Sequence, residues 1–307
     1  MSNPRSIARM AAAVLLLAGT GHASQLEVEV NDLSPKFLAF YDAAVAEKAG
    51  PERRFQLWKE KYGFAALPPV PERDEMARKL LDTAWPTYPE VLGRIREGAA
   101  GMRPQPEPVL REVAAKLGAD RPLKVEILAY VGAREQNAYF FPQNGTLNLA
   151  IPVEESPDWR ELVMVHEMTH AVNHALAGFA EGWERTIART LLAEGLATRV
   201  TESLRPGRGE AAYVEHKPGW LAEAHGKRRE ILEGIRPHLR AKDSAAVMRF
   251  TMGTGTTGLE REAYFAGWLV VGHLLQQGKT FPELARLQEE QIPEIMEKAL
   301  GEMLAAK

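Results

Sequence analysis

The stretch VMVHEMTHAVNHAL, residues 163–176, constrains the fold more than any other part of the chain. Its apolar residues recur at helical spacing, which predicts a helix buried against a core, yet it also carries three histidines and a glutamate. Ser156 and Pro157 are typical of a helix start and Gly178 of a helix end, so we predict a helix over 157–177. Buried histidine and glutamate side chains need polar partners, which the rest of the fold has to supply.

The spacing of two of these histidines predicts a metal site. His166 and His170 stand four residues apart, so both project from one face of the helix, about 6 Å apart along its axis. Glu167 lies one step round the helix from His166, where a carboxylate can take a proton from water that the metal activates. This HExxH arrangement has the logic of a zinc hydrolase. The alternative is a helix whose polar residues only form hydrogen bonds.

His174 is too far along the helix to join the same ion. It follows His166 by eight residues, which is about 12 Å on a straight helix, whereas a zinc–nitrogen bond measures about 2.1 Å. We therefore interpret His174 as a residue that lies beside the site or at the surface. The metzincin form of the motif would need glycine at 173 and histidine at 176, but the chain has Asn173 and Leu176.

A catalytic zinc takes three protein ligands and keeps one position open, and the chain has no cysteine to serve as a ligand. Glu194 is the preferred third ligand because it sits in the apolar run 191–200, where an unpaired carboxylate would be costly. It follows His170 by 24 positions, which leaves room for a turn and an antiparallel return. Glu181 and Glu184 are the alternatives, together with His225.

An HExxH motif followed by a glutamate in an EGLA segment resembles the gluzincin metallopeptidases. More narrowly, the chain looks similar to a poorly characterised bacterial group of predicted zinc-dependent proteases. The opening FLAFYDAA…RRFQLW, the strand TLNLAIPV and the later EAYFAGW fit that group. The resemblance implies a zincin-like fold and one zinc ion held by His166, His170 and Glu194. It also implies that Glu167 is the general base.

The chain departs from the thermolysin pattern on either side of the third ligand. That pattern has Asn just before the ligand glutamate and Asp four residues after it, where this chain has Ala193 and Thr198. Thr198, one helical turn past the glutamate, is therefore the candidate for the residue that supports His170 from behind.

Hydrolysis of a peptide bond at such a site develops an oxyanion, which usually needs a hydrogen-bond donor beyond the metal. Tyr264, in the segment REAYFAGW, is the first candidate, and Gly267 permits its helix to approach closely. His225, His238 and His273 are the other candidates. The alternative interpretation of Tyr264 is an ordinary half-buried aromatic residue.

The remaining pattern predicts a mainly helical α+β fold, zincin-like, with a small sheet beside the metal-binding helix. Residues 123–132 alternate like a strand, and 137–153 read as a hairpin that turns at Asn144-Gly145. We expect 146–153 to be an exposed sheet edge, with or without an extended peptide paired to it. The other helices are expected at roughly 34–61 with a break at Gly50-Pro51, 72–100 with breaks at two prolines, 108–118, 182–204, 219–236, 260–277 and 281–305.

The first residues have the composition of a secretory signal. Arg5 and Arg9 precede an apolar run, and small residues follow where a signal peptidase cleaves. We expect residues 1–23 to be a signal peptide and the protein to be exported, either periplasmic or secreted; an ordinary N-terminal helix is the alternative. Residues 24–120 then form an N-terminal helical region and 121–307 the catalytic region, together one two-lobed unit. No later run is long enough to span a membrane.

The leading functional hypothesis is an exported zinc-dependent peptidase that acts on a peptide or protein. A zinc-containing binding or chaperone-like module, and a metal-dependent hydrolase of a non-peptide bond, are the alternatives. The net charge of −3 and the lack of a basic stripe argue against nucleic-acid binding. The glycine-rich loop 251–258 lacks the Lys-Ser/Thr pair of a phosphate-binding loop, so we expect no nucleotide there. The absence of cysteine excludes disulfides and thiol chemistry.

Overall fold

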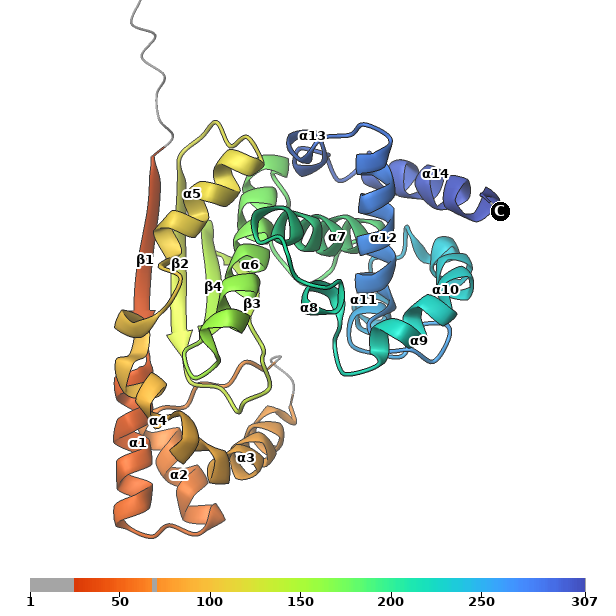
Figure 1. The fold of residues 1–307 in the computed structure, drawn as a ribbon. Helices are drawn as coiled ribbons and strands as arrows, with labels where there is room; N and C mark the ends of the chain where they lie inside the picture. Colours follow the sequence, from red (N-terminus) through yellow and green to blue (C-terminus); the bar gives the residue numbers. More distant parts are fainter. Residues whose placement is uncertain (1–24, 68–70, 307) are drawn as a thin grey trace, which may run out of the picture.

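The computed structural model describes residues 25–67 and 71–306 (Figure 1). These residues form a mainly helical α+β fold with one small sheet beside the histidine-bearing helix, as predicted from the sequence. The signal peptide expected at residues 1–23 lies outside the described residues.

The sheet has four strands in the order β1-β2-β4-β3. β1 (Leu26–Asp32), β2 (Leu123–Tyr130) and β4 (Thr146–Pro152) run parallel, and β3 (Tyr139–Gln143) pairs antiparallel with β4. β1 was not predicted from the sequence. Its glutamates point to solvent, whereas Leu26 and Val28 are half-buried against the core, so this contact and the pairing with β2 together hold the strand in place. Because of β1, the sheet takes strands from both sides of residue 120.

The hairpin between β3 and β4 forms as predicted, with Asn144 and Gly145 at φ of 52° and 75° in its two-residue turn. The expectation that 146–153 is a sheet edge is wrong. β4 pairs with β2 on one side and with β3 on the other, so it lies inside the sheet. The edge next to the hairpin is β3.

Helix α6 (Pro157–Ala177) packs on one face of the sheet together with α5 (Pro106–Lys116) (Figure 1). It begins and ends where predicted. The hydroxyl of Ser156 accepts a hydrogen bond from the amide of Trp159 at 3.3 Å, and Gly178 ends the helix with a left-handed φ of 65°. Its fully buried apolar residues anchor it to the core: Met164, Val165, Met168, Ala171 and Val172.

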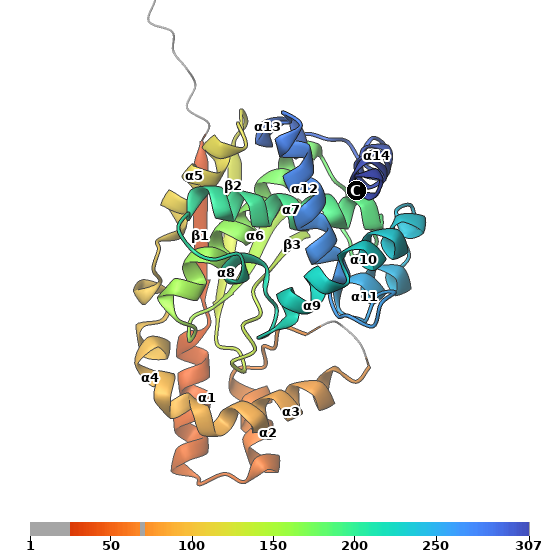
Figure 2. The same cartoon turned by 45° about the vertical axis from the view of Figure 1, so that its right-hand side comes forward.

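Four helices between β1 and α5 lie at the end of the sheet toward which its parallel strands run (Figures 1 and 2). They are α1 (Ser34–Ala46), α2 (Pro51–Lys61), α3 (Arg73–Ala84) and α4 (Tyr88–Glu97), with short 3-10 turns η1 (Trp85–Thr87) and η2 (Gly98–Gly101). The breaks at Gly50-Pro51 and after residue 84 agree with the glycine and proline positions in the sequence.

The second half of the chain is helical. α7 (Ile187–Leu204) lies against α6, and α12 (Glu262–Gln276) crosses α7 in both views (Figures 1 and 2). Two glycines, Gly195 and Gly267, allow the two helices to approach closely where they cross. A Cβ atom on Gly195 would lie 2.1 Å from the carbonyl oxygen of Gly267, and one on Gly267 would lie 2.4 Å from that of Leu191. The expectation that Gly267 permits a close approach is therefore confirmed.

The remaining helices differ from those predicted, because the helices expected at 219–236 and 281–305 are each divided into shorter ones and two further helices form where none was expected. They are α8 (Ala211–Val214), α9 (Trp220–Gly226), α10 (Arg228–Ile235), η3 (Arg236–His238), α11 (Ser244–Thr251), α13 (Phe281–Ala285) and α14 (Ile292–Ala305). α7 also starts later than expected, because Thr186 caps it by accepting a hydrogen bond from the amide of Arg189 at 3.1 Å. In the part of the chain described, no helix combines the length and the apolar character that a membrane span requires.

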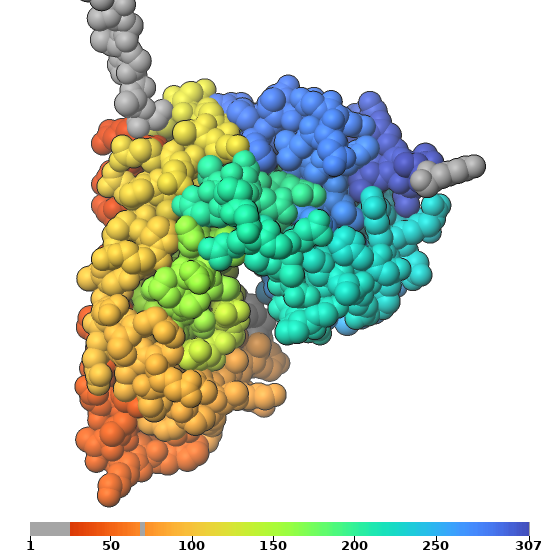
Figure 3. All heavy atoms as spheres, viewed as in Figure 1, coloured from red at the N-terminus to blue at the C-terminus, as the bar shows by residue number. Residues whose placement is uncertain are grey.

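Figure 3 shows a notch in the molecular surface on the side of the molecule that Figure 1 presents. It lies between the lime-coloured part of the chain, which includes the start of α6, and the teal-coloured part around α8 and α9.

Candidate metal centre

Two neighbouring helices bring three potential metal ligands together. α6 supplies His166 and His170, and α7 supplies Glu194. The carboxylate Oε2 of Glu194 lies 3.3 Å from Nε2 of His166 and 3.4 Å from Nε2 of His170. One donor atom from each residue lies within 4.8 Å of the others. Within the described residues, no other group of three His, Asp or Glu side chains meets this condition.

Two of the separations between these atoms fit a tetrahedral zinc ion. With metal–ligand bonds of about 2.0–2.1 Å, two ligand atoms on a tetrahedron lie about 3.3–3.4 Å apart. The two distances from Glu194 match that separation. The side chains are 18%, 13% and 9% exposed for His166, His170 and Glu194, so the group is recessed but still open to solvent. Two imidazoles and one carboxylate leave a fourth position free, as a catalytic site needs.

The charge of Glu194 needs compensation, as the sequence suggested. Burial by itself raises the pKa of this carboxyl, but the charges of the two imidazoles and their hydrogen bonds outweigh it and hold the pKa well below the usual range. The carboxylate is therefore ionised and needs positive charge beside it. A divalent cation held by the three side chains would supply that charge.

Glu167 lies next to this group but does not belong to it. Its side chain is 6% exposed. Burial, reinforced by the charge of Glu194, raises its pKa from 4.5 to about 7, against the opposing effects of His166, the main-chain amide of Phe140 and Arg261. A carboxyl with a pKa near neutrality is suited to take up and release protons.

The start of α12 lies on another side of the group. Tyr264 is half-buried, and the pKa of its hydroxyl is raised by burial and by the charge of Glu194, which places the two residues near each other. The guanidinium of Arg261 lies over the Tyr264 ring, 4.0 Å from its centre. The pKa of Arg261 is raised, against the effect of its burial, first by Tyr264, with which it forms a side-chain hydrogen bond, and then by the charges of Glu194 and Glu167. Tyr264 and Arg261 therefore both lie within electrostatic range of the glutamates at the metal group.

The strand β3 borders the site as well. In a hairpin with a two-residue turn, the residues that flank the turn, here Gln143 and Thr146, form a hydrogen-bonded pair. Hydrogen-bonded and non-hydrogen-bonded pairs then alternate along the two strands, so the main-chain groups of Phe140 and Pro142 point away from β4. The amide of Phe140 then interacts with Glu167. Pro142 has no N–H to leave unpaired at this edge. The free edge of the sheet is therefore next to the glutamate of the HExxH motif.

The alternative third ligands lie elsewhere. The carboxylate of Glu181 accepts hydrogen bonds from the amides of Asn144 and Gly145, at 3.1 and 2.7 Å, and so holds the hairpin turn. Glu184 is exposed and accepts from the hydroxyl of Ser244 at 3.3 Å. Neither joins the group around the histidines.

The other histidines are also placed away from the group. His225 packs against Phe265 and Trp268 in α12, with its Nε2 3.7 Å from Glu210. His238 contacts Phe250, and His273 pairs with Glu302 at 3.1 Å. None of the three belongs to the group of potential ligands.

His174 lies outside the ligand group, as the helix geometry required. Its ring packs between Phe140 and Phe179, and burial lowers its pKa to about 4, so it is neutral at physiological pH. Thr198 does not support His170. Its hydroxyl donates to the main-chain carbonyl of Glu194 at 2.9 Å, so the role expected for it is wrong.

Sequence reasoning missed two features of the site. The first is Arg261, which precedes Tyr264 by three residues. This is the spacing of neighbours on one helix face, so the sequence could have predicted that the two side chains lie together. His216, whose Nδ1 lies 3.0 Å from Nη1 of Arg261, has no such signal because it comes from a distant loop.

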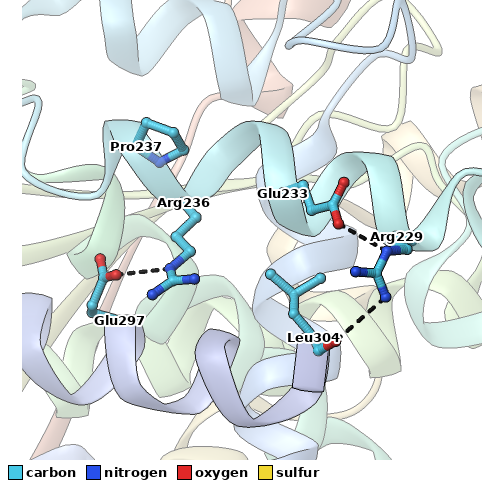
Figure 4. Close-up of a pocket in the computed structure, with 6 residues that line it drawn as sticks. All are labelled: Arg229, Glu233, Arg236, Pro237, Glu297 and Leu304. Carbon is cyan, nitrogen blue, oxygen red and sulfur yellow. Dashed lines mark hydrogen bonds and ion pairs between the residues drawn. The ribbon is translucent and has the colours of Figure 1, made fainter. Parts of the chain in front are cut away.

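A surface hollow between α10 and α14 is distinct from the metal group. It is lined by Arg229, Glu233, Arg236, Pro237, Glu297 and Leu304. Figure 4 shows that its two arginines are already paired, Arg229 with Glu233 and Arg236 with Glu297, at 2.8 and 2.7 Å. It therefore offers no unpaired charge to a ligand.

Comparison of the chain with protein-family models, with curated proteins and with solved structures finds no match in any of the three.

Proposed function

We propose that this protein is an exported zinc-dependent peptidase of the gluzincin type, with His166, His170 and Glu194 as zinc ligands. The observation that carries the proposal is the convergence of these three donors, with both Glu194–histidine separations matching a tetrahedral ion and a buried carboxyl, Glu167, directly beside them. A site that only binds a metal has no need for a proton acceptor in that position. The proposed substrates are peptides or proteins.

The residues around the ligands have separate tasks in this proposal. A bound zinc ion supplies a Lewis acid, which activates water and polarises a carbonyl oxygen. Glu167 accepts a proton from the attacking water and delivers it to the leaving amine, for which a pKa of about 7 is suitable. The hydroxyl of Tyr264 donates a hydrogen bond to the carbonyl oxygen of the substrate as negative charge develops there.

The edge of β3 offers a way to orient the substrate. An extended peptide can add to a sheet edge through main-chain hydrogen bonds. The outward-facing groups at Phe140 and Pro142 lie on that edge, beside Glu167. A peptide paired there would run past the metal group in a defined direction.

The first test measures zinc and peptide cleavage in the same preparations. The purified protein should hold about one zinc, and His166→Ala or His170→Ala should remove it, whereas His225→Ala should keep it as the matched control. Glu194→Gln keeps the shape but removes the charge, so zinc should bind much more weakly. Full zinc content in either of the two ligand-histidine variants, measured by elemental analysis, would contradict the assignment.

The second test concerns the general base. Glu167→Gln should retain zinc and lose about a hundred- to ten-thousand-fold in turnover, because an amide cannot accept the proton. Glu107→Gln, an exposed position on α5, is the control for the same chemical change. A peptide-library digest with and without chelator provides the assay. Zinc binding without any cleavage would favour the non-catalytic module, and cleavage of esters but not peptides would favour a hydrolase of another bond.

A further inference from the structure

Arg261 has a backbone conformation that is unusual for its residue type. It occupies the position before α12 with φ of 60° and ψ of 36°, in the left-handed region that residues other than glycine rarely adopt. Both neighbours are anchored. The indole of Trp220 donates to the carbonyl of Glu260 at 2.8 Å, and the buried carboxylate of Glu262 accepts four hydrogen bonds from two threonines in the preceding loop. The surrounding structure therefore fixes the direction in which Arg261 points.

The guanidinium that is fixed in this way lacks an acidic partner. It lies over the ring of Tyr264, forms a side-chain hydrogen bond with that residue, and contacts Nδ1 of His216 at 3.0 Å. Within residues 25–67 and 71–306, no carboxylate lies at ion-pairing distance from it. By contrast, Arg229 and Arg236 in Figure 4 each have a glutamate. A guanidinium carries five N–H donors, so most of those of Arg261 remain available.

The charges around Tyr264 favour an anion once a metal is bound. The charges of Glu194 and Glu167 act on Arg261 from beyond ion-pairing distance, and the positive charge of Arg185 also acts on Tyr264. A divalent ion on the ligand group, two carboxylates and two guanidiniums together leave a net positive charge. Such a recessed positive site raises the local concentration of anionic substrates.

We propose that the guanidinium of Arg261 binds a carboxylate of the substrate next to the His166–His170–Glu194 group. The planar fork of arginine matches a carboxylate with two parallel hydrogen bonds, which a neutral partner cannot reproduce. The carboxylate is either the free C-terminus of a peptide or the side chain of an aspartate or glutamate near the cleaved bond. This inference rests on the proposed function, because it names the substrate class of the same site.

The test measures binding without turnover, in zinc-loaded Glu167→Gln protein. The probes are N-acetyl-penta-alanine as the free acid, the same peptide as its C-terminal amide, and the amide with one glutamate placed at each position in turn. Each glutamate peptide has a glutamine counterpart. Dissociation constants are obtained by calorimetry for Glu167→Gln alone and with Arg261→Gln, Arg261→Lys or Arg229→Gln added. Arg229→Gln removes the same charge at a remote surface position.

At least one carboxylate peptide should bind about ten- to a hundredfold more tightly than its neutral counterpart, as expected for a charge-assisted hydrogen bond. Arg261→Gln should abolish that difference, Arg261→Lys should keep part of it, and Arg229→Gln should leave it unchanged. A preference for the free acid identifies the C-terminus as the ligand, and a preference for one glutamate position identifies a side chain.

Equal binding of charged and neutral peptides would overturn the inference, as would a preference that survives Arg261→Gln or the failure of every carboxylate peptide to bind. The comparison of acid with amide needs no change at Arg261, so it stands even if that variant does not fold. Failure of the proposed function looks different, because the protein would then not hold zinc or would not cleave any peptide.

Discussion

The crossing of α7 and α12 yields a quantitative prediction about stability. Alanine at Gly195 would place its Cβ 2.1 Å from the carbonyl oxygen and 2.5 Å from the carbonyl carbon of Gly267. Both are main-chain atoms, so no side-chain rotation can relieve the overlap, and the helices must separate by roughly 1 Å. Overpacking of a core typically costs 1–3 kcal/mol, and for a main-chain clash between two buried helices we expect about 3 kcal/mol.

Gly93 provides the matched control, because it is an exposed glycine inside α4 with nothing within 4 Å of a Cβ atom. The same substitution there should stabilise the protein by about 0.5–1 kcal/mol, since alanine loses less backbone entropy in a helix. Thermal and urea unfolding, followed by circular dichroism with chelator present, measure both variants without a contribution from bound metal. Gly195→Ala should lower Tm by about 6–10 °C.

The Gly195 variant also tests how the crossing supports the site. Glu194 precedes Gly195, so a shift of α7 should disturb its 3.3 and 3.4 Å contacts with His166 and His170 and weaken zinc binding. A Gly195→Ala protein as stable as the wild type, or no less stable than Gly93→Ala, would refute the view that this crossing leaves no room for a methyl group.

Two other predictions concern single side chains. Burial raises the pKa of Glu154 from 4.5 to about 8, and its Oε2 has no hydrogen-bond partner among the described residues. Between pH 4.5 and about 8 the folded protein holds a proton on Glu154 that the unfolded chain has lost. The free energy of unfolding should therefore fall as pH rises through this range, by up to about 5 kcal/mol. Glu154→Gln should flatten this dependence in urea titrations from pH 4.5 to 9, and an unchanged slope would contradict the assignment. Tyr264→Phe should lower kcat about a hundred- to a thousandfold with little change in KM or zinc content, if its hydroxyl stabilises the oxyanion. Unchanged kcat would make Tyr264 a packing residue.

Local chemistry made part of the structure predictable. Ser156, Pro157 and Gly178 bound α6 because capping and left-handed backbone preferences act within a few residues. The Asn144-Gly145 turn follows for the same reason. That His166 and His170 share one face of the helix could be predicted from helical periodicity alone. The burial of Glu194 could be predicted from its apolar neighbours in the sequence.

Long-range pairing was less predictable. β1 was not predicted although its LEVEV segment alternates apolar and acidic residues, and its partner β2 lies about a hundred residues later in the chain. Whether β3 or β4 forms the edge of the sheet depends on which of the two also pairs with β2, and the sequence of a hairpin does not predict this. Thr198 was misjudged because a threonine inside a helix readily bonds the carbonyl four residues back, here that of Glu194.

The sequence by itself determined the helix that carries the HExxH motif and the residue types that could hold a metal. Only the tertiary structure decided that Glu194, rather than Glu181 or Glu184, meets the histidines, because that depends on the angle and depth at which α7 packs on α6. It likewise decided that Arg261 faces Tyr264 without an acidic partner. Helical periodicity is set by neighbours in the chain, whereas convergence of side chains is set by packing between elements, which no local pattern encodes.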